Sequence, residues 1–290
     1  MTEFSLHLQG DEPYTMDDLQ AVLRRLLAPD GCPWDRVQTH MSLRKNMIEE
    51  AYEVVDAIDS GRPERLADEL GDVLLQVVFH AALAERDKEF SLSNITDHLV
   101  RKLIFRHSHV FGTDTADTPD DVLSVWDTNK QKEKGHRSVS ETLLDIPEGL
   151  PALMRADKLQ KKASKVGFDW PHAEGALNKV EEELEEIKIA ISDADLPPFE
   201  KISPEKSPAA YAEIEEEVGD FLFAAVNYAR LLGIDPEVAL TRSNRKFTRR
   251  FSSVESLAKE DGKSLSDMQL EEMDALWDIV KHKEKNGVGS

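Results

Sequence analysis

The sequence predicts an all-α protein that is built from two related helical modules. Three observations support this prediction. Apolar residues recur at helical spacing along most of the chain, no segment alternates apolar and polar residues as a half-buried strand does, and several short motifs occur twice in the same order. With 290 residues and 40% hydrophobic content, each half is long enough to bury a core of its own.

In the first half, helical periodicity covers residues 16–28, 42–60, 62–85 and 91–109. Ser91 stands directly before the last of these apolar patterns, where a serine can cap the first turn of a helix. Residues 135–151 combine turn-forming residues without a sustained period. We therefore predict a first module at residues 1–134 and a linker at residues 135–150.

In the second half, which we predict to be a module at residues 151–290, helical periodicity covers residues 173–191, 209–232, 236–261 and 265–285. Asp235 precedes Pro236, and proline fits the first turn of a helix because its missing N–H would be unpaired there. The segment 192–208 contains four prolines and cannot form one continuous helix. We predict a mobile proline-rich loop in this segment.

An internal repeat relates the two halves. The sequence EEAYEVVDAI at residues 49–58 matches EELEEIKIAI at 182–191, and LADELGDVL at 66–74 matches IEEEVGDFL at 214–222. Two further matches follow in the same order: KLIFR at 102–106 with KFTRR at 246–250, and Trp126 with Trp277. Four matches in one order indicate that the chain contains two diverged copies of one module.

Charge and composition exclude several classes of partner. The chain has 57 acidic against 36 basic residues and a formal net charge of -21, which would repel DNA, RNA and anionic membranes. We therefore expect no nucleic-acid partner and no membrane partner. The one cysteine, Cys32, cannot form an internal disulfide, and the first residues lack the layout of a signal peptide, so a cytoplasmic location is predicted. An anionic substrate would need bound cations or a local basic patch.

The same two acidic motifs occur in both copies: E-E-x-x-E on one predicted helix and E-x-x-D on the next. Residues three apart share a helix face, so two facing helices would bring four carboxylates together. Such a group suits Mg²⁺ or Mn²⁺, although an isolated acidic motif is more often only a solvated face. Glycines recur inside the second helix of each copy, which favours a site. The candidate metal ligands are Glu50, Glu53, Glu69 and Asp72 in the first module and Glu183, Glu186, Glu217 and Asp220 in the second.

A basic pair accompanies the acids in each copy. Lys102 and Arg106, like Lys246 and Arg250, are four residues apart on one helix face. If that helix lies beside the carboxylates, the pair supplies positive charge for phosphate oxygens. The alternative is a solvated face or ordinary ion pairs. For Trp126 and Trp277, stacking on a base and packing in a core both remain open.

The chain resembles the MazG nucleoside triphosphate pyrophosphohydrolases of the all-α NTP pyrophosphatase superfamily, in their two-module bacterial form. The resemblance extends from GCPWD at residues 31–35, through the acid motifs, ADKLQ at 156–160 and VGFDW at 166–170, to Trp277. It implies Mg²⁺-dependent cleavage of NTP or dNTP between the α and β phosphates, giving a monophosphate and pyrophosphate, in nucleotide pool cleaning or the control of nucleotide levels. It also implies a homodimer of four-helix modules.

The resemblance further implies that the second module holds the nucleotide, while one alternative makes the other module a non-catalytic dimerisation or regulatory unit. A di-iron site is not expected, because it would need Glu-x-x-His pairs. Our mechanistic hypothesis makes Glu182, or Glu49 in the first module, the acid that orients or deprotonates the attacking water. The implied nucleotide and phosphate contacts are Lys179, Val180, Glu181, Glu182, Glu183, Glu213, Ile214, Glu215, Glu216, Lys246, Phe247, Thr248, Arg249, Arg250 and Trp277, and more weakly Lys102, Arg106 and Trp126.

Overall fold

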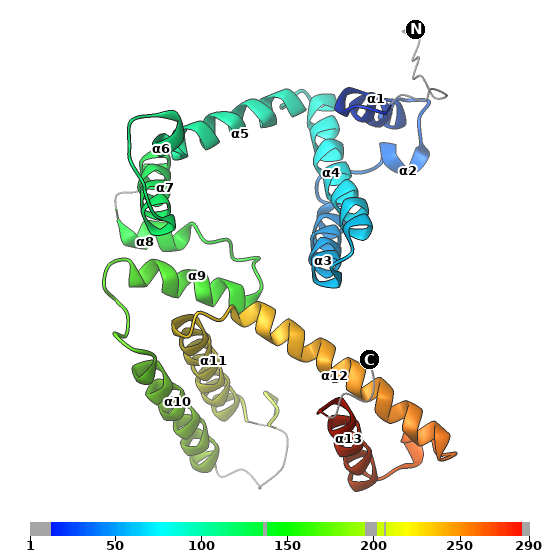
Figure 1. Cartoon of the computed structure of the whole chain (residues 1–290), viewed down its shortest axis with the longest axis vertical. Coiled ribbons are helices and arrows are strands. Elements are labelled where there is room, and N and C mark those ends of the chain that lie inside the picture. Colours follow the sequence, from blue (N-terminus) through cyan, green and yellow to red (C-terminus); the bar gives the residue numbers. More distant parts are fainter. Residues whose placement is uncertain (1–12, 136–137, 195–201, 206, 286–290) are drawn as a thin grey trace. The chain divides into compact units, whose positions relative to one another are not determined.

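The computed structural model describes residues 13–135, 138–194, 202–205 and 207–285, and its regular structure there is entirely helical (Figure 1). The all-α prediction is confirmed. Contacts divide the chain into two compact units, residues 1–134 and residues 135–290, which we call unit 1 and unit 2. Within the described residues, no helix is long and apolar enough to cross a membrane.

Unit 1 contains two long antiparallel helices and several shorter ones. Its first helix begins with a capping box, in which the Asp18 amide donates to the Thr15 hydroxyl and the Thr15 amide donates to the Asp18 carboxylate at 2.8 Å. Ser91 and Asn94 form the same motif later in the unit. The helices are α1 (Met16–Leu27), α2 (Pro33–Arg36), α3 (Arg44–Ser60), α4 (Pro63–Arg86), α5 (Leu92–Arg106), α6 (Ser108–Phe111) and α7 (Pro119–Lys134).

The turn between α3 and α4 determines where their acidic faces meet. Gly61 ends α3 in the left-handed conformation at φ 64°, which glycine adopts without steric cost. Pro63 then occupies the first turn of α4, as its missing N–H allows. The short connection leaves α3 and α4 packed against each other along their length.

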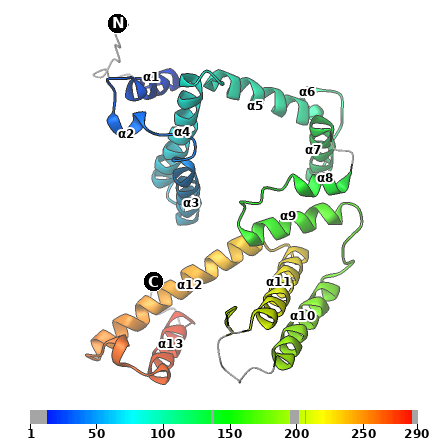
Figure 2. The same cartoon turned by 180° about the vertical axis from the view of Figure 1, so that it is seen from behind.

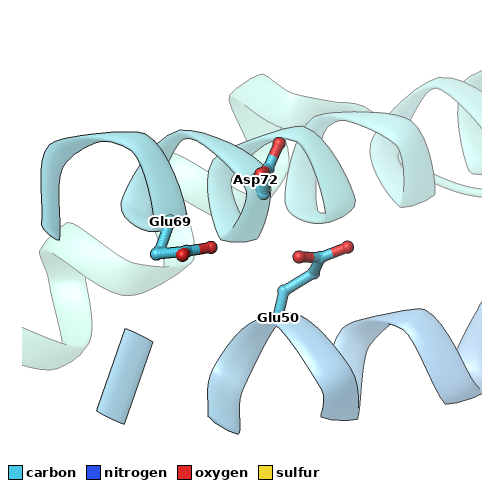
Figure 3. Close-up of side chains that lie close together, drawn as sticks. All are labelled: Glu50, Glu69 and Asp72. Atoms are coloured by element: carbon cyan, nitrogen blue, oxygen red, sulfur yellow. The ribbon is translucent and has the colours of Figure 1, made fainter. Parts of the chain in front are cut away.

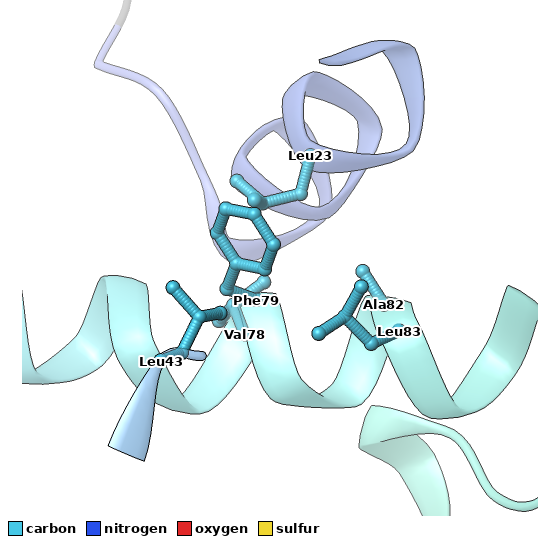
Figure 4. Close-up of a cluster of buried hydrophobic side chains, with 6 residues drawn as sticks. All are labelled: Leu23, Leu43, Val78, Phe79, Ala82 and Leu83. Atoms are coloured by element: carbon cyan, nitrogen blue, oxygen red, sulfur yellow. The ribbon is translucent and has the colours of Figure 1, made fainter. Parts of the chain in front are cut away.

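The core of unit 1 lies where α1 and the segment before α3 pack on α4 (Figure 4). Leu23 of α1, Leu43, and Val78, Phe79 and Leu83 of α4 are each at most 5% exposed. Burying such side chains contributes roughly 1.5–3 kcal/mol each relative to leaving them in water. This packing holds the C-terminal half of α4 and so fixes the helix that carries Glu69 and Asp72.

Unit 2 repeats the long helical pair. Figures 1 and 2 show α10 and α11 side by side, and this pair has the most extensive contact of any two helices in the unit. The helix before them, α9, packs on both α11 and α12, and α12 packs on the last helix. The helices are α8 (Val139–Leu144), α9 (Ala152–Ser164), α10 (Ala173–Asp193), α11 (Pro208–Leu231), α12 (Pro236–Glu260), the 3₁₀ turn η1 (Leu265–Asp267) and α13 (Leu270–Lys285).

The predicted helix boundaries were wrong in two places. Residues 91–109 do not form one helix, because His107 leaves helical geometry at φ -97°, ψ 49° between α5 and α6. Residues 265–285 are divided in the same way by extended backbone at Met268. Helices α2, α7, α8 and α9 were not predicted. The first and third of these have four and six residues, too short for a period to be recognised.

The two predicted connecting segments contain structure of their own. Helix α8 lies within the predicted linker at residues 135–150. In the proline-rich segment 192–208, α10 extends to Asp193 and α11 begins at Pro208. Residues 195–201 and 206, which belong to the predicted mobile loop, lie outside the described residues.

Candidate functional site

Three carboxylates of unit 1 converge between α3 and α4. Glu50 extends from α3, and Glu69 and Asp72 lie on the facing helix α4 (Figure 3). Each offers an oxygen, and these oxygens all lie within 4.8 Å of one another. Glu69 and Asp72 share a face because they are one helical turn apart. The unit thus presents a compact group of hard oxygen donors.

Unit 2 has a second carboxylate group, between α10 and α11. Glu183 and Glu186 come from α10 and Glu217 from α11, again with oxygens within 4.8 Å of one another. Glu183 is buried at 5% exposure, and the other two are half-buried. Two of its members, Glu183 and Glu217, match Glu50 and Glu69 in the repeat. The two units therefore place acids at equivalent points of equivalent helix pairs.

The two groups are not identical sets of the predicted ligands. Glu53 is absent from the first group of three and Asp220 from the second, and both side chains are exposed. Glu53 is still near enough for its charge to raise the pKa of Glu50. Each group therefore contains three of its four predicted ligands. The fourth is Glu53 on α3 in unit 1 and Asp220 on α11 in unit 2.

One acid in each group, Glu50 in unit 1 and Glu186 in unit 2, has a raised pKa. Burial raises the pKa of Glu50, and the charges of Asp72 and Glu53 raise it further. A hydrogen bond with Glu183 raises the pKa of Glu186, with partial burial and the Glu183 charge acting in the same direction. Partial burial and the neighbouring acids therefore both disfavour the charged form of Glu50 and of Glu186. Three converging carboxylates offer the hard oxygen ligands that suit a divalent cation of the Mg²⁺ or Mn²⁺ type.

The two carboxylate groups differ in whether a lysine contacts them. In unit 2 the Lys179 ammonium lies 2.6 Å from Glu183 and 2.9 Å from Glu182, and these carboxylates raise the pKa of Lys179. The matching residue in unit 1 is Asn46. There, Lys45 pairs with Glu49 at 2.9 Å on the exposed side of α3. Of these three lysine contacts, only that between Lys179 and Glu183 involves a member of a carboxylate group.

Gln76 is a further residue of the first site that sequence reasoning did not select. It is 7% exposed on α4, one turn after Asp72, and its side chain hydrogen-bonds to Glu50 and so opposes the rise in the pKa of that acid. A polar residue that interrupts the apolar run at 73–84 was the available indication. In unit 2 the matching residue is Ala224, so this contact cannot be repeated.

The second member of each basic pair has the same environment in both units. Arg106 pairs with Glu133 of α7 at 2.7 Å, and its guanidinium lies 5.2 Å from the centre of the Trp126 ring. Arg250 pairs with Glu284 of α13 at 2.8 Å and lies 5.8 Å from the Trp277 ring. Among the described residues, these arginines thus pair with the last helix of their unit and not with the clustered acids. Trp126 and Trp277 are both half-buried, and each has an arginine guanidinium over its ring.

The remaining predicted contacts differ in how accessible they are. Ile214 is 8% exposed and belongs to the core, because it faces inward from α11. Lys102 and Val180 are half-buried. Arg249 shares Glu284 with Arg250, and the Thr248 hydroxyl donates to the Asn244 carbonyl. The exposed side chains are Glu181 and Glu182 on α10, Glu213, Glu215 and Glu216 on α11, and Lys246, Phe247, Thr248 and Arg249 on α12.

Comparison with known proteins identifies one family. Residues 38–111 and 173–255 each match the MazG nucleotide pyrophosphohydrolase domain, so each match includes one carboxylate group. The chain is 42% identical over 265 residues to the nucleoside triphosphate pyrophosphohydrolase/pyrophosphatase MazG of Thermotoga maritima, which covers 91% of this chain and 95% of that protein. It is 39% identical over 270 residues to the nucleoside triphosphate pyrophosphohydrolase of Escherichia coli K12, covering 93% and 98%. An uncharacterised protein of Bacillus subtilis, YabN, is 44% identical over 92% of this chain and 51% of its own length.

Proposed function

The chain belongs to the MazG nucleotide pyrophosphohydrolase family, and we propose that it hydrolyses nucleoside triphosphates between the α and β phosphates. The products would be a nucleoside monophosphate and pyrophosphate. The observation that carries this proposal is the recurrence of a three-carboxylate group at equivalent positions of both units. A polyphosphate is itself anionic, so such a group can take part in its binding only together with cations.

We propose that Glu183, Glu186 and Glu217 hold a divalent cation, Mg²⁺ by the chemistry of its ligands, with Asp220 one helical turn from Glu217. A cation bound there would supply positive charge that neutralises phosphate oxygens and favours attack on phosphorus. The pKa of Glu186 is raised by a hydrogen bond with Glu183, by partial burial and by the Glu183 charge. This supports the assignment, because a bound cation would favour the charged form of both acids.

The chain supplies cations of its own for the phosphates. Lys179 already lies at 2.6 Å from Glu183, so its ammonium is positioned at the edge of the carboxylate group. We propose that it donates to a phosphate oxygen when the substrate is bound. Glu182, which pairs with Lys179 at 2.9 Å, is exposed, and we propose that it orients or deprotonates the attacking water. Lys246 and Arg249 are two exposed cations of α12, and we propose that they bind the outer phosphates.

We propose that unit 2 carries the turnover and that unit 1 mainly supports assembly. In unit 1 the position of Lys179 is occupied by Asn46, and Glu69 pairs with Arg65 at 3.4 Å. Unit 1 also exposes large apolar side chains on one face of α5, namely Leu99, Val100 and Leu103. Such a face favours burial against another protein surface, and a homodimer would provide one.

The first experiment is to incubate the purified protein with each nucleoside triphosphate in Mg²⁺ and in EDTA, and to identify the phosphate products by chromatography. We expect monophosphate and pyrophosphate only with Mg²⁺. Glu183→Gln should abolish turnover at unchanged helix content by circular dichroism, whereas Glu185→Gln, two residues away and outside the group, should leave it intact. Orthophosphate and diphosphate as products would contradict the cleavage position, and normal turnover of Glu183→Gln would contradict the assignment to unit 2.

A further inference from the structure

Two histidines of unit 1 meet edge to edge. His40 lies in the segment 37–43 between α2 and α3, and His80 lies on α4. Their Nδ1 atoms are 2.7 Å apart, which is hydrogen-bond distance. The ring centres are 5.0 Å apart and the ring planes differ by 4°. Because the Nδ1 separation leaves only the two ring radii for the rest of that distance, the rings lie end on in nearly one plane.

This geometry requires a proton between the two rings. A neutral imidazole has one N–H donor and one acceptor nitrogen, whereas a protonated ring has two donors and no acceptor. Two acceptor lone pairs would repel each other at 2.7 Å, and so would two N–H groups. The contact therefore forms only while one Nδ1 carries a proton and the other does not, and it breaks when both rings are positively charged.

The surroundings of the two rings indicate which one accepts. His80 is half-buried and His40 is exposed. Burial lowers the pKa of His80, and the charge on His40 lowers it further. A hydrogen bond from Arg86 lowers the pKa of Asp87, and the charge on His40 acts in the same direction. A carboxylate thus lies within electrostatic reach of His40, while the more buried ring, His80, is the one that stays neutral and accepts the hydrogen bond.

The other charged groups near the pair largely neutralise one another. Ion pairs join Arg24 to Glu85 at 2.9 Å, Lys45 to Glu49 at 2.9 Å and Arg86 to Asp87 at 3.0 Å. Among the described residues, the charge that acts on the pKa of His80 is that of His40. The charged residues of the neighbouring segments are Arg24 on α1, Asp35 and Arg36 on α2, Arg44, Lys45 and Glu49 on α3, and Glu85, Arg86 and Asp87 on α4.

The histidine pair connects the segment 37–43 to α4. Within the segment, the Thr39 amide donates to the Ser42 hydroxyl at 2.9 Å and the Ser42 amide donates to the Thr39 hydroxyl at 3.1 Å. Leu43, at 2% exposure, packs into the core at the end of the segment (Figure 4). Among the described residues, the hydrogen bond from this segment to α4 is that between His40 and His80. Breaking it frees the exposed part of the segment while Leu43 stays packed.

The pair is specific to unit 1. The repeat that relates the two units aligns His80 with Tyr228. A tyrosine hydroxyl cannot replace the second imidazole, because it does not take up or release a proton near neutral pH. A response to acid through these rings therefore belongs to unit 1.

We propose that His40 and His80 form a pH-sensitive histidine latch: a proton held between their Nδ1 atoms connects the segment 37–43 to α4, and protonation of both rings opens it. In the closed latch the His40 Nδ1–H donates to the His80 Nδ1. The first proton added below neutral pH goes to the exposed His40 Nε2 and leaves this hydrogen bond in place. The next goes to the His80 Nδ1, so both rings become cationic and repel each other.

The position of the latch gives its opening a consequence for the fold. Helix α3 begins directly after the segment, at Arg44, and carries Glu50 of the first carboxylate group. The open state has an ordinary histidine pKa of about 6.5 and binds the added proton more tightly than the closed state does. Opening therefore becomes more favourable as the pH falls below about 6.5. This inference is independent of the proposed function.

The shared proton can be observed by NMR in the full chain labelled with ¹⁵N-histidine. At about pH 7.5 the two Nδ1 nuclei should show a scalar coupling across the hydrogen bond, and at about pH 5 the coupling should be lost. His40→Gln, at an exposed position that keeps the fold, and His80→Tyr, which copies unit 2, should each abolish it. Absence of the coupling at both pH values, with each ring titrating as it does in the single variants, would overturn the inference.

Hydrogen exchange measures the opening itself. The Leu43 amide donates to the Thr39 carbonyl at 3.2 Å, so its protection reports whether the segment is closed. After correction for intrinsic exchange, this protection should fall about tenfold for each pH unit below about 6.5, because opening takes up one proton. His40→Gln should remove this pH dependence, whereas His98→Gln, at an exposed histidine of α5, should keep it. Equal pH dependence in wild type and His40→Gln, or none in wild type, would overturn the latch.

Discussion

The ion pair between Asp169 and Arg230 gives the sharpest prediction about stability. Replacing Asp169 with asparagine removes the charge but keeps one acceptor for the guanidinium. The two side chains are 21% and 10% exposed, so water replaces little of what is lost. A hydrogen bond to a charged group contributes about 1.5–3 kcal/mol, and the remaining amide oxygen retains part of it. We expect Asp169→Asn to lower the free energy of unfolding of unit 2 by about 2 kcal/mol.

The pH dependence of this effect has a definite sign. Arg230 holds the pKa of Asp169 below its ordinary value. A carboxylate with a depressed pKa stabilises the folded state above its unfolded pKa of roughly 3.9, and this contribution is lost as pH falls through the folded pKa. The difference between wild type and Asp169→Asn should therefore be full at pH 7 and should shrink progressively below about pH 4.

Differential scanning calorimetry measures this difference and separates the transitions of the two units. For a domain the size of residues 135–290, a loss of about 2 kcal/mol corresponds to a fall in Tm of roughly 4–8 °C. Glu185→Gln is the matched control, because Glu185 and its partner Lys188 are 62% and 60% exposed and such pairs contribute little. A Tm of Asp169→Asn equal to that of the control at pH 7 would refute the reasoning.

Three further predictions concern other parts of the chain. Leu83→Ala, at a side chain with 0% exposure, should destabilise unit 1 by about 2–5 kcal/mol through the cavity that it leaves, as measured by urea unfolding; a loss below 1 kcal/mol would contradict the packing of that core. Glu284→Gln should lower the melting temperature of unit 2 and increase protease cleavage near α13, because Arg249 and Arg250 both lose their charged partner; unchanged cleavage would show that the pairs do not hold that helix. Mg²⁺ at about a hundredfold excess over its Kd should raise the free energy of unfolding by about 2.7 kcal/mol. EDTA should reverse this stabilisation, and Glu183→Gln should reduce it. Stabilisation that persists in a variant lacking both carboxylate groups would place the cation elsewhere.

The sequence by itself determined the helical elements and the repeat. Periodicity, capping residues such as Ser91 and proline at first turns are local properties, so they act on the chain before any long-range contact forms. The spacing of Glu69 and Asp72 likewise decides that both lie on one face of α4, whatever packs against it. Breaks such as that at His107 were missed because the apolar pattern continues through them.

Only the tertiary structure decided which of these side chains meet. Local spacing gives Glu53 and Asp220 the same standing as their neighbours, yet in the folded chain neither belongs to a group of three. The partners of Arg106 and Arg250 lie 27 and 34 residues further along the chain, a separation that no helical period specifies. Unit 2 has a pocket of about 620 Å³ between α9, α11 and the loop at residues 167–170, while similar motifs in unit 1 close on a packed core. Whether a contact is filled or open depends on side-chain volumes from several elements at once, and this is a property of the folded chain alone.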